Sequence, residues 1–130
     1  MRIDHLAIWT SDLEKMKAFY VRYFGMVAGE KYVNPVKKFE SYFLSFQLGD
    51  TARIELMRNP FTRDNKSERG LSFGYAHIAI SVGSVEKVNT ITQELRIDGY
   101  RVIGEPRTTG DGYYESIVAD IEGNWVEITI

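Results

Sequence analysis

The 130-residue sequence contains no cysteine, which excludes a disulfide framework, a thiolate metal site and a cysteine nucleophile together. No stretch approaches the roughly 20 apolar residues that span a bilayer, and the start lacks the pattern of a signal peptide. The formal net charge is only -2, so the surface lacks the positive excess that binds nucleic-acid phosphates. We therefore expect a soluble, cytoplasmic protein that binds neither nucleic acid nor a membrane.

Two halves of the chain resemble each other on either side of a polar linker, residues 59–74. The matching segments are Asp4-His5-Leu6-Ala7-Ile8 with Ala76-His77-Ile78-Ala79-Ile80, and Ile54-Glu55-Leu56 with Val126-Glu127-Ile128. Both matches have an offset of 72 positions, which separates the two histidines and also the two glutamates (77 − 5 and 127 − 55). A repeat of this length, present twice, predicts one supersecondary unit that is duplicated and packs on itself.

The first half has the pattern of a strand, a helix and three further strands. Ser11 followed by Glu14 is a capping-box pattern that predicts a helix start, and Gly25 ends the helix. Apolar residues at helical spacing lie between them: Leu13, Met16, Tyr20, Tyr23 and Phe24. The predicted strands span residues 2–9, 26–33, 41–48 and 51–58, with Gly49-Asp50 as the turn before the last one.

The second half repeats this order. A helix from Val85 to about Asp98 is predicted to turn Val88, Ile91 and Leu95 inward. The predicted strands span residues 75–82, 101–105, 112–120 and 124–130, with Glu122-Gly123-Asn124 as the final turn. Each unit is therefore βαβββ, and the fold class is α+β. We expect one domain, residues 1–130, in which repeats of about 1–58 and 75–130 form a curved cup of mixed sheets.

The repeat gives the polar strand residues a common position. The chain holds only two histidines, His5 and His77, and each occupies the same place in its unit, as do Glu55 and Glu127. Side chains alternate along a strand, and aliphatic residues flank each of these four positions. The aliphatic face can pack on the helix, so the histidines and glutamates are expected on the opposite face, pointing into the cup.

A divalent metal ion explains this set. Buried carboxylates are costly unless a positive charge neutralises them, and two neutral imidazoles with two carboxylates balance one divalent cation. Mixed nitrogen and oxygen ligation suits Ni, Co, Zn, Mn or Fe(II), and four protein ligands leave positions open for water or substrate. The alternative is a duplicated fold that kept these residues but lost the ion.

These segments resemble glyoxalase I (lactoylglutathione lyase) of the vicinal oxygen chelate superfamily, which also contains bleomycin resistance proteins and dioxygenases. The segments that carry the resemblance are Asp4 to Ile8, Phe19-Tyr20-Val21-Arg22-Tyr23-Phe24-Gly25, Ile54 to Leu56, residues 74–82 and Gly123 to Ile128. The order His, Glu, His, Glu is similar to that of glyoxalase I. Related dioxygenases and thiol transferases typically use two histidines and one glutamate.

The resemblance implies a particular reaction. The substrate would be a hemithioacetal of a 2-oxoaldehyde such as methylglyoxal and a thiol such as glutathione, isomerised for detoxification through a metal-bound enediolate. Glu127 or Glu55 would move the proton between neighbouring carbons, and which acts first stays open. The implied metal is Ni, Co or Zn, and short chains of this kind resemble the nickel- or cobalt-activated members more than the zinc ones. The implied site lies across a homodimer, with His5 and Glu55 from one subunit and His77 and Glu127 from the other. A site within one chain remains an alternative.

Three residues are candidates for substrate binding. Asn59 matches a family asparagine that contacts glutathione, although it also suits an ordinary loop before a proline. Trp9 stands where many glyoxalase I chains have an arginine that binds a glutathione carboxylate, which is a departure from the family pattern. Arg107 offers a positive charge that is either substrate-binding or simply solvated. Of the adjacent Tyr113 and Tyr114, we expect one to be part of the core.

Other functions fit the same sequence. One alternative is a different metal-dependent enzyme of the superfamily, an epimerase or an antibiotic-modifying thiol transferase. Another is a binding protein that sequesters a drug in the cup. The complete ligand set argues against sequestration, which needs no metal, whereas Trp9 and the tyrosine pair favour it because aromatic walls suit flat ligands.

Overall fold

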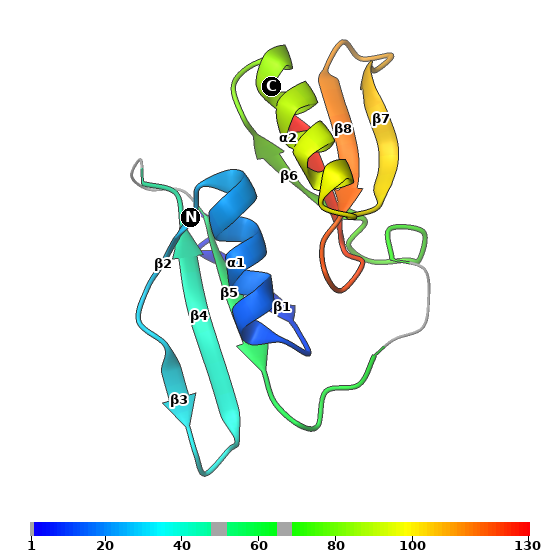
Figure 1. Cartoon of the computed structure of the whole chain (residues 1–130). Coiled ribbons are helices and arrows are strands. Elements are labelled where there is room, and N and C mark those ends of the chain that lie inside the picture. Colours follow the sequence, from blue (N-terminus) through cyan, green and yellow to red (C-terminus); the bar gives the residue numbers. More distant parts are fainter. Residues whose placement is uncertain (1, 48–51, 65–68) are drawn as a thin grey trace. The chain divides into compact units, whose positions relative to one another are not determined.

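The computed structural model describes residues 2–47, 52–64 and 69–130, which form two compact units, Met1–Asn65 and Lys66–Ile130 (Figure 1). Each unit has one helix and its own mixed sheet. The fold class is therefore α+β with two βαβββ-like modules, as the sequence predicts. That both repeats form one domain stays a prediction, and the predicted turn at Gly49-Asp50 lies outside the described residues. In the part of the chain that the structure describes, no helix is long and apolar enough to cross a membrane.

In the first unit, strand β1 (His5–Trp9) and helix α1 (Leu13–Phe24) come first. The other strands are β2 (Val27–Ala28), β3 (Tyr32–Asn34), β4 (Phe39–Ser45) and β5 (Arg53–Arg58). The sheet order is β1-β5-β4-β2, with β3 also paired to β4, and β1 runs parallel to β5. The first strand in the chain thus pairs with the last one of its unit.

The predicted continuous strand over residues 26–33 was wrong. It is two short strands, β2 and β3, which both pair antiparallel with β4. The amide of Gly29, just after β2, still donates to the carbonyl of Phe43 at 2.9 Å. Residues 30–31 do not pair with β4. This edge of the sheet is therefore formed by two short strands separated by a break.

The second unit has the same topology with one strand fewer. Its elements are β6 (His77–Ser81), α2 (Val85–Ile97), β7 (Val102–Thr108), β8 (Tyr114–Ala119) and β9 (Trp125–Thr129). The sheet order is β6-β9-β8-β7, with β6 parallel to β9 and the other pairs antiparallel. The turn before β9 is tied by Asp120, whose carboxylate accepts from the amides of Glu122 and Asn124.

Helix α1 begins one residue later than the capping-box pattern predicts. Asp12, not Ser11, is the N-cap, and its carboxylate accepts from the amide of Lys15 at 3.0 Å. With Asp12 as the N-cap, the third helical residue is Lys15 and not Glu14, so no capping box forms. The Glu14 carboxylate instead accepts from Tyr42 at 3.0 Å and from Lys31 at 3.3 Å. Gly25 ends the helix as predicted, with a φ of 63° that suits glycine.

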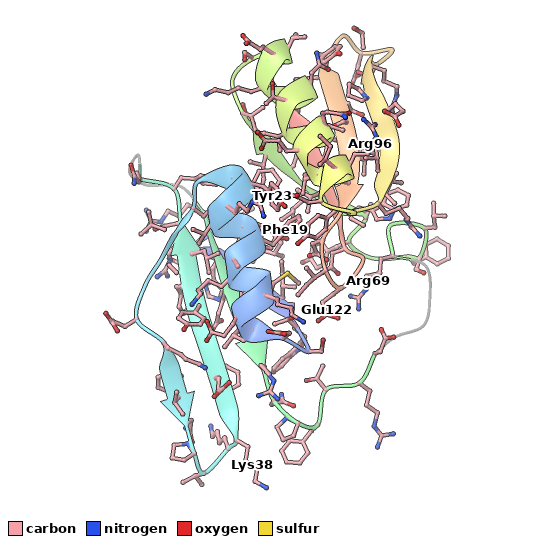
Figure 2. The ribbon with its side chains drawn as sticks, viewed as in Figure 1. Phe19, Tyr23, Lys38, Arg69, Arg96 and Glu122 are labelled. Carbon is pink, nitrogen blue, oxygen red and sulfur yellow. The ribbon has the colours of Figure 1, made fainter. Side chains whose placement is uncertain are left out.

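All five residues predicted at inward spacing on α1 are buried, and so is Phe19, which that set did not include. On α1, Phe19 and Tyr23 lie one turn apart with ring centroids 5.4 Å from each other (Figure 2). On α2, Val88 and Leu95 are fully buried, but Ile91 is only half-buried and its neighbour Thr92 is buried instead. The Thr92 hydroxyl donates to the carbonyl of Val88 at 2.6 Å and lies 2.6 Å from the hydroxyl of Ser116 on β8. These hydrogen bonds make the burial of a polar side chain tolerable.

We predict that Leu95→Ala lowers the free energy of unfolding by about 2–5 kcal/mol, because the fully buried leucine would leave a cavity next to the sheet. Urea denaturation measures the change. Ile97→Ala, on the same helix but 73% exposed, is the matched control and should change stability by no more than about 0.5 kcal/mol. Equal effects of the two substitutions would contradict this assignment of the core.

Candidate metal centre

In the first unit, the parallel pairing of β1 with β5 brings His5 and Glu55 together. Ala7 lies opposite Glu55 and His5 opposite Arg53, so the histidine is a diagonal neighbour of the glutamate on one face of the sheet. His5 Nε2 lies 3.7 Å from Glu55 Oε2. The buried residues on either side of Glu55, Ile54 and Leu56, point to the opposite, core-facing side. The predicted alternation is confirmed in this unit.

The second unit repeats this arrangement. Ala79 lies opposite Glu127 in the parallel pair of β6 and β9, and His77 Nε2 lies 3.3 Å from Glu127 Oε2. The side chain of His77 is 38% exposed and that of Glu127 16%, compared with 39% and 16% for the pair in the first unit. The register, the donor atoms and the exposure thus agree between two segments that are 72 positions apart.

The spacing of the two donor atoms within each pair suits their binding to the same metal ion. Two ligand atoms about 2.1 Å from a shared ion lie roughly 3.0–3.4 Å apart in octahedral or tetrahedral geometry. The observed separations, 3.7 Å and 3.3 Å, are close to this range. An imidazole nitrogen with a carboxylate oxygen is also a suitable donor set for a divalent transition metal. Among the described residues of each unit, no group of three or more such side chains could hold an ion, so each unit supplies one pair of candidate ligands.

Asp4 and Arg53 surround His5 in the first unit, and sequence reasoning missed both. Asp4 Oδ2 lies 2.9 Å from His5 Nδ1, and the same carboxylate accepts from the Arg53 guanidinium. Hydrogen bonds from His5 and from Arg53 lower the pKa of Asp4 to about 2. The only signal in the sequence was that Asp4 precedes a predicted ligand, because the Arg53 partner is brought in by strand pairing.

Glu115 is a further carboxylate near the pair of the second unit. It lies opposite Thr129 on β9 and opposite Arg107 on β7, so it shares the sheet face of Glu127. Burial raises its pKa, the charge of Glu127 adds to this, and Arg107 opposes it. Sequence reasoning missed Glu115 because nothing at the matching place in the first unit is acidic.

The structure places two of the substrate-binding candidates in the first unit. Trp9 is on the sheet face of His5, 40% exposed, with its ring edge-on to Phe39 at 6.1 Å between centroids. Asn59 Oδ1 accepts from the amides of Phe61 and Thr62, both at 2.8 Å. Its side-chain oxygen therefore organises the loop after β5, and a contact with substrate stays a prediction.

The other candidates are in the second unit. Arg107 is half-exposed on β7 and lies 3.4 Å from the Glu115 carboxylate, so it is an ion-paired residue rather than a merely solvated one. Tyr113 is exposed, whereas Tyr114 is half-buried and donates to Asn89 of α2 at 2.8 Å. The expectation that one tyrosine of this pair is part of the core was therefore wrong, because the Tyr114 hydroxyl binds Asn89 at the surface and its side chain is only half-buried.

Two βαβββ-like units that each present a His–Glu pair on the open face of the sheet are typical of a duplicated metal-binding fold. Residues 2–128 match the model of the Glyoxalase/Bleomycin resistance protein/Dioxygenase superfamily, and the chain belongs to this superfamily. Members generally bind a divalent metal ion, and most are enzymes.

Individual relatives agree with this placement. The chain is 35% identical over 107 residues to the uncharacterized protein YwkD of Bacillus subtilis (strain 168), a match that covers 82% of this chain and 80% of the relative. It is similar to the Leishmania major glyoxalase I structure at 25% identity and a TM-score of 0.77, over 99% of this chain and 86% of that one. Glyoxalase I from Zea mays shares the fold at 23% identity and a TM-score of 0.78, over 98% of this chain and 44% of the maize chain.

We predict that Glu115→Gln changes how the stability of the metal-free protein depends on pH. The raised pKa of Glu115 means that the folded state binds this proton more tightly than the unfolded chain does. Wild type therefore loses stability as the pH rises above about 4.5, through the raised pKa, and the glutamine variant does not. Urea denaturation at several pH values should show the variant gaining relative to wild type toward neutral pH. An equal gain for Glu94→Gln, an exposed carboxylate on α2, would contradict the prediction.

Proposed function

We propose that this protein is a metal-dependent isomerase of the glyoxalase I type. One divalent ion, Ni, Co or Zn, is bound by His5, Glu55, His77 and Glu127. The observation that carries the proposal is the equal geometry of the two His–Glu pairs, with matching register, donor atoms and exposure. Two neutral imidazoles and two carboxylates together neutralise a divalent cation, so this set is complete in charge as well as in number.

In this proposal the substrate is a hemithioacetal of a 2-oxoaldehyde and a thiol. A bound divalent ion supplies Lewis-acid polarisation of the substrate oxygens. Glu127 or Glu55 removes the proton from the carbon that bears sulfur and returns it to the neighbouring carbon. The hydroxyl proton on the first carbon passes to the oxygen on the neighbouring carbon, so the product is a 2-hydroxy thioester. Both carboxylates are mostly buried, with side chains only 16% exposed. Water therefore has little access to the carboxylate that holds the proton between the two steps.

The thiol is the least constrained part of the proposal. Glutathione is the candidate co-substrate, with Asn59, Trp9 and Arg107 as binding residues. Arg107 is already paired with Glu115, and Trp9 offers an aromatic surface rather than a charge. The glyoxalase I of Leishmania major is described as trypanothione-dependent. A thiol other than glutathione is therefore also a candidate co-substrate.

We predict that metal-free protein gains isomerase activity on addition of Ni²⁺, Co²⁺ or Zn²⁺. Thioester formation from methylglyoxal with glutathione, or with a second thiol, is followed by its ultraviolet absorbance. Glu127→Gln and Glu55→Gln should each lower kcat/KM by at least about 100-fold, because each substitution removes a ligand and a base. Glu94→Gln makes the same change of charge on the exposed face of α2 and should keep activity. Activity that persists in both site variants would contradict the proposal.

In the same proposal the site forms across a homodimer, with His5 and Glu55 from one subunit and His77 and Glu127 from the other. This arrangement is inherited from the family resemblance, and a cyclic dimer of this kind would contain two equivalent sites. It makes a prediction that a site within one chain does not make.

We predict that two inactive double variants restore activity when their subunits are mixed. One is His5→Gln with Glu55→Gln, and the other is His77→Gln with Glu127→Gln. Each mixed dimer would contain one intact site, so free exchange of subunits should recover about a quarter of wild-type activity and of bound metal. If the four ligands lie within one chain, mixing recovers nothing, and that outcome would exclude the shared site.

A second candidate function is supported by one observation, an aromatic row on the site face of the first sheet. Trp9, Phe39 and Tyr32 are in successive contact, with centroid distances of 6.1 Å for both pairs. A row of this kind suits a flat apolar molecule and would serve a drug-sequestering protein. Drug binding that survives removal of the metal would favour sequestration, whereas binding that requires the metal favours the enzyme.

A further inference from the structure

The surroundings of His5 form a connected cluster on the first sheet. The backbone of Arg53 donates to the carbonyl of Asp4 at 3.0 Å, which holds the start of β1 beside β5. The Arg53 side chain donates to the Asp4 carboxylate and lies over the ring of Phe43, 4.4 Å from its centroid. The Phe43 ring meets the His5 ring edge-on at 5.3 Å. Each member therefore contacts the next, and the cluster closes on His5 through Asp4.

This geometry decides which nitrogen of His5 carries the proton. Asp4 Oδ2 lies 2.9 Å from Nδ1, and an ionised carboxylate can only accept a hydrogen bond. The proton of neutral His5 must therefore be on Nδ1. The lone pair of Nε2 is then directed away from Asp4, on the side where Glu55 Oε2 lies at 3.7 Å. A lone pair in this position is what a ligating imidazole requires.

The second unit provides an internal comparison, because it repeats the His–Glu pair without this cluster. Ala76 precedes His77, so there is no carboxylate at the place of Asp4. Trp125 lies opposite His77 at the place of Arg53, and Ile117 lies opposite Glu127 at the place of Phe43. Trp125 instead packs against Gly70, where an added Cβ would overlap the indole ring. Among the described residues, the surroundings of the second pair are thus packing contacts and not a charged group hydrogen-bonded to the histidine.

We propose that Asp4, held by Arg53, is a positioning residue that fixes the Nδ1-protonated form of His5, so that the His5–Glu55 pair is organised for a metal ion before the His77–Glu127 pair is. The identity of the ion and the reaction rest on the proposed function, but the hydrogen bond itself does not. No hydrogen bond holds Nδ1 of His77 among the described residues, and the Glu127 carboxylate, 3.3 Å from its Nε2, by the same argument favours the Nε2-protonated form in the metal-free protein. That form must move its proton before Nε2 can bind an ion. The two repeats then offer the same pair of candidate ligands, but only in the first is the histidine held in the protonation form that leaves Nε2 free to bind an ion.

The test uses the fact that the chain has only two histidines. Nitrogen NMR of the metal-free protein, recorded at alkaline pH where the ring signals no longer change with pH, resolves two rings, and His77→Gln assigns them. In wild type, His5 should be protonated mainly at Nδ1 and His77 mainly at Nε2. Asp4→Ala should move the His5 proton toward Nε2. Arg53→Met should move it part of the way, because Asp4 then loses its support.

Metal affinity gives a second readout. Asp4→Ala should weaken Ni²⁺ binding by about 10–100-fold, the usual cost of losing a group that orients a ligand. Glu30→Ala, an exposed carboxylate of the same unit, should leave both the ring signals and the affinity unchanged. Thermal unfolding of each variant shows whether it is folded, and the Arg53 variant keeps the test open if Asp4→Ala does not fold.

The outcomes separate this inference from the proposed function. If His5 shows the same mixture in wild type and in Asp4→Ala, the positioning role is overturned, whether or not the protein binds metal. If the ring signals shift as expected but wild type binds no metal and has no activity, the positioning of His5 stands and the proposed function fails. If signals and affinity both change, both are supported.

Discussion

The parallel pairing of the first strand of each unit with the last strand is the constraint on which the rest of this structure depends. β1 pairs with β5 and β6 with β9 in the same register, with Ala7 opposite Glu55 and Ala79 opposite Glu127. Because side chains alternate along a strand, this register determines which face carries the polar residues. A slip of one residue in either pair would turn the glutamate toward the helix. The core and the candidate metal ligands are therefore set by one pairing.

Burial of carboxylates gives this arrangement its chemical meaning. The side chains of Glu55 and Glu127 are only 16% exposed, and an unpaired carboxylate at such depth is unfavourable. Each one lies near an imidazole nitrogen, which is a poor counter-charge while it is neutral. A divalent ion would neutralise both carboxylates and use both imidazoles. The same physics explains why Glu115, a third carboxylate close to Glu127, has a raised pKa and lies beside Arg107.

The two repeats share the candidate metal ligands, His and Glu, but differ in the residues around them. The first unit surrounds its histidine with Asp4, Arg53 and Phe43, and it carries an aromatic row on the same face. The second unit has Ala76, Trp125 and Ile117 at the corresponding places. In a site built from both pairs, His5 would therefore be positioned by charged hydrogen-bonding groups and His77 by packing contacts. In such a site the shared His–Glu pairs would supply the metal ligands. Asp4 and Trp9, which differ between the repeats, would adjust metal affinity and select the substrate.

The sequence by itself determined the two units, their helices, the superfamily and the face of the sheet on which His5, Glu55, His77 and Glu127 lie. The units, the helices and the faces follow from local periodicity and from a repeat, and the superfamily follows from the resemblance of the segments around these residues. Only the tertiary structure decided that Asp12 and not Ser11 caps α1, that Thr92 and not Ile91 is buried, and that the edge strand is interrupted. It alone also joined Asp4 to Arg53 and Arg107 to Glu115. These features depend on contacts between residues that are distant in the sequence, so local sequence patterns do not predict them.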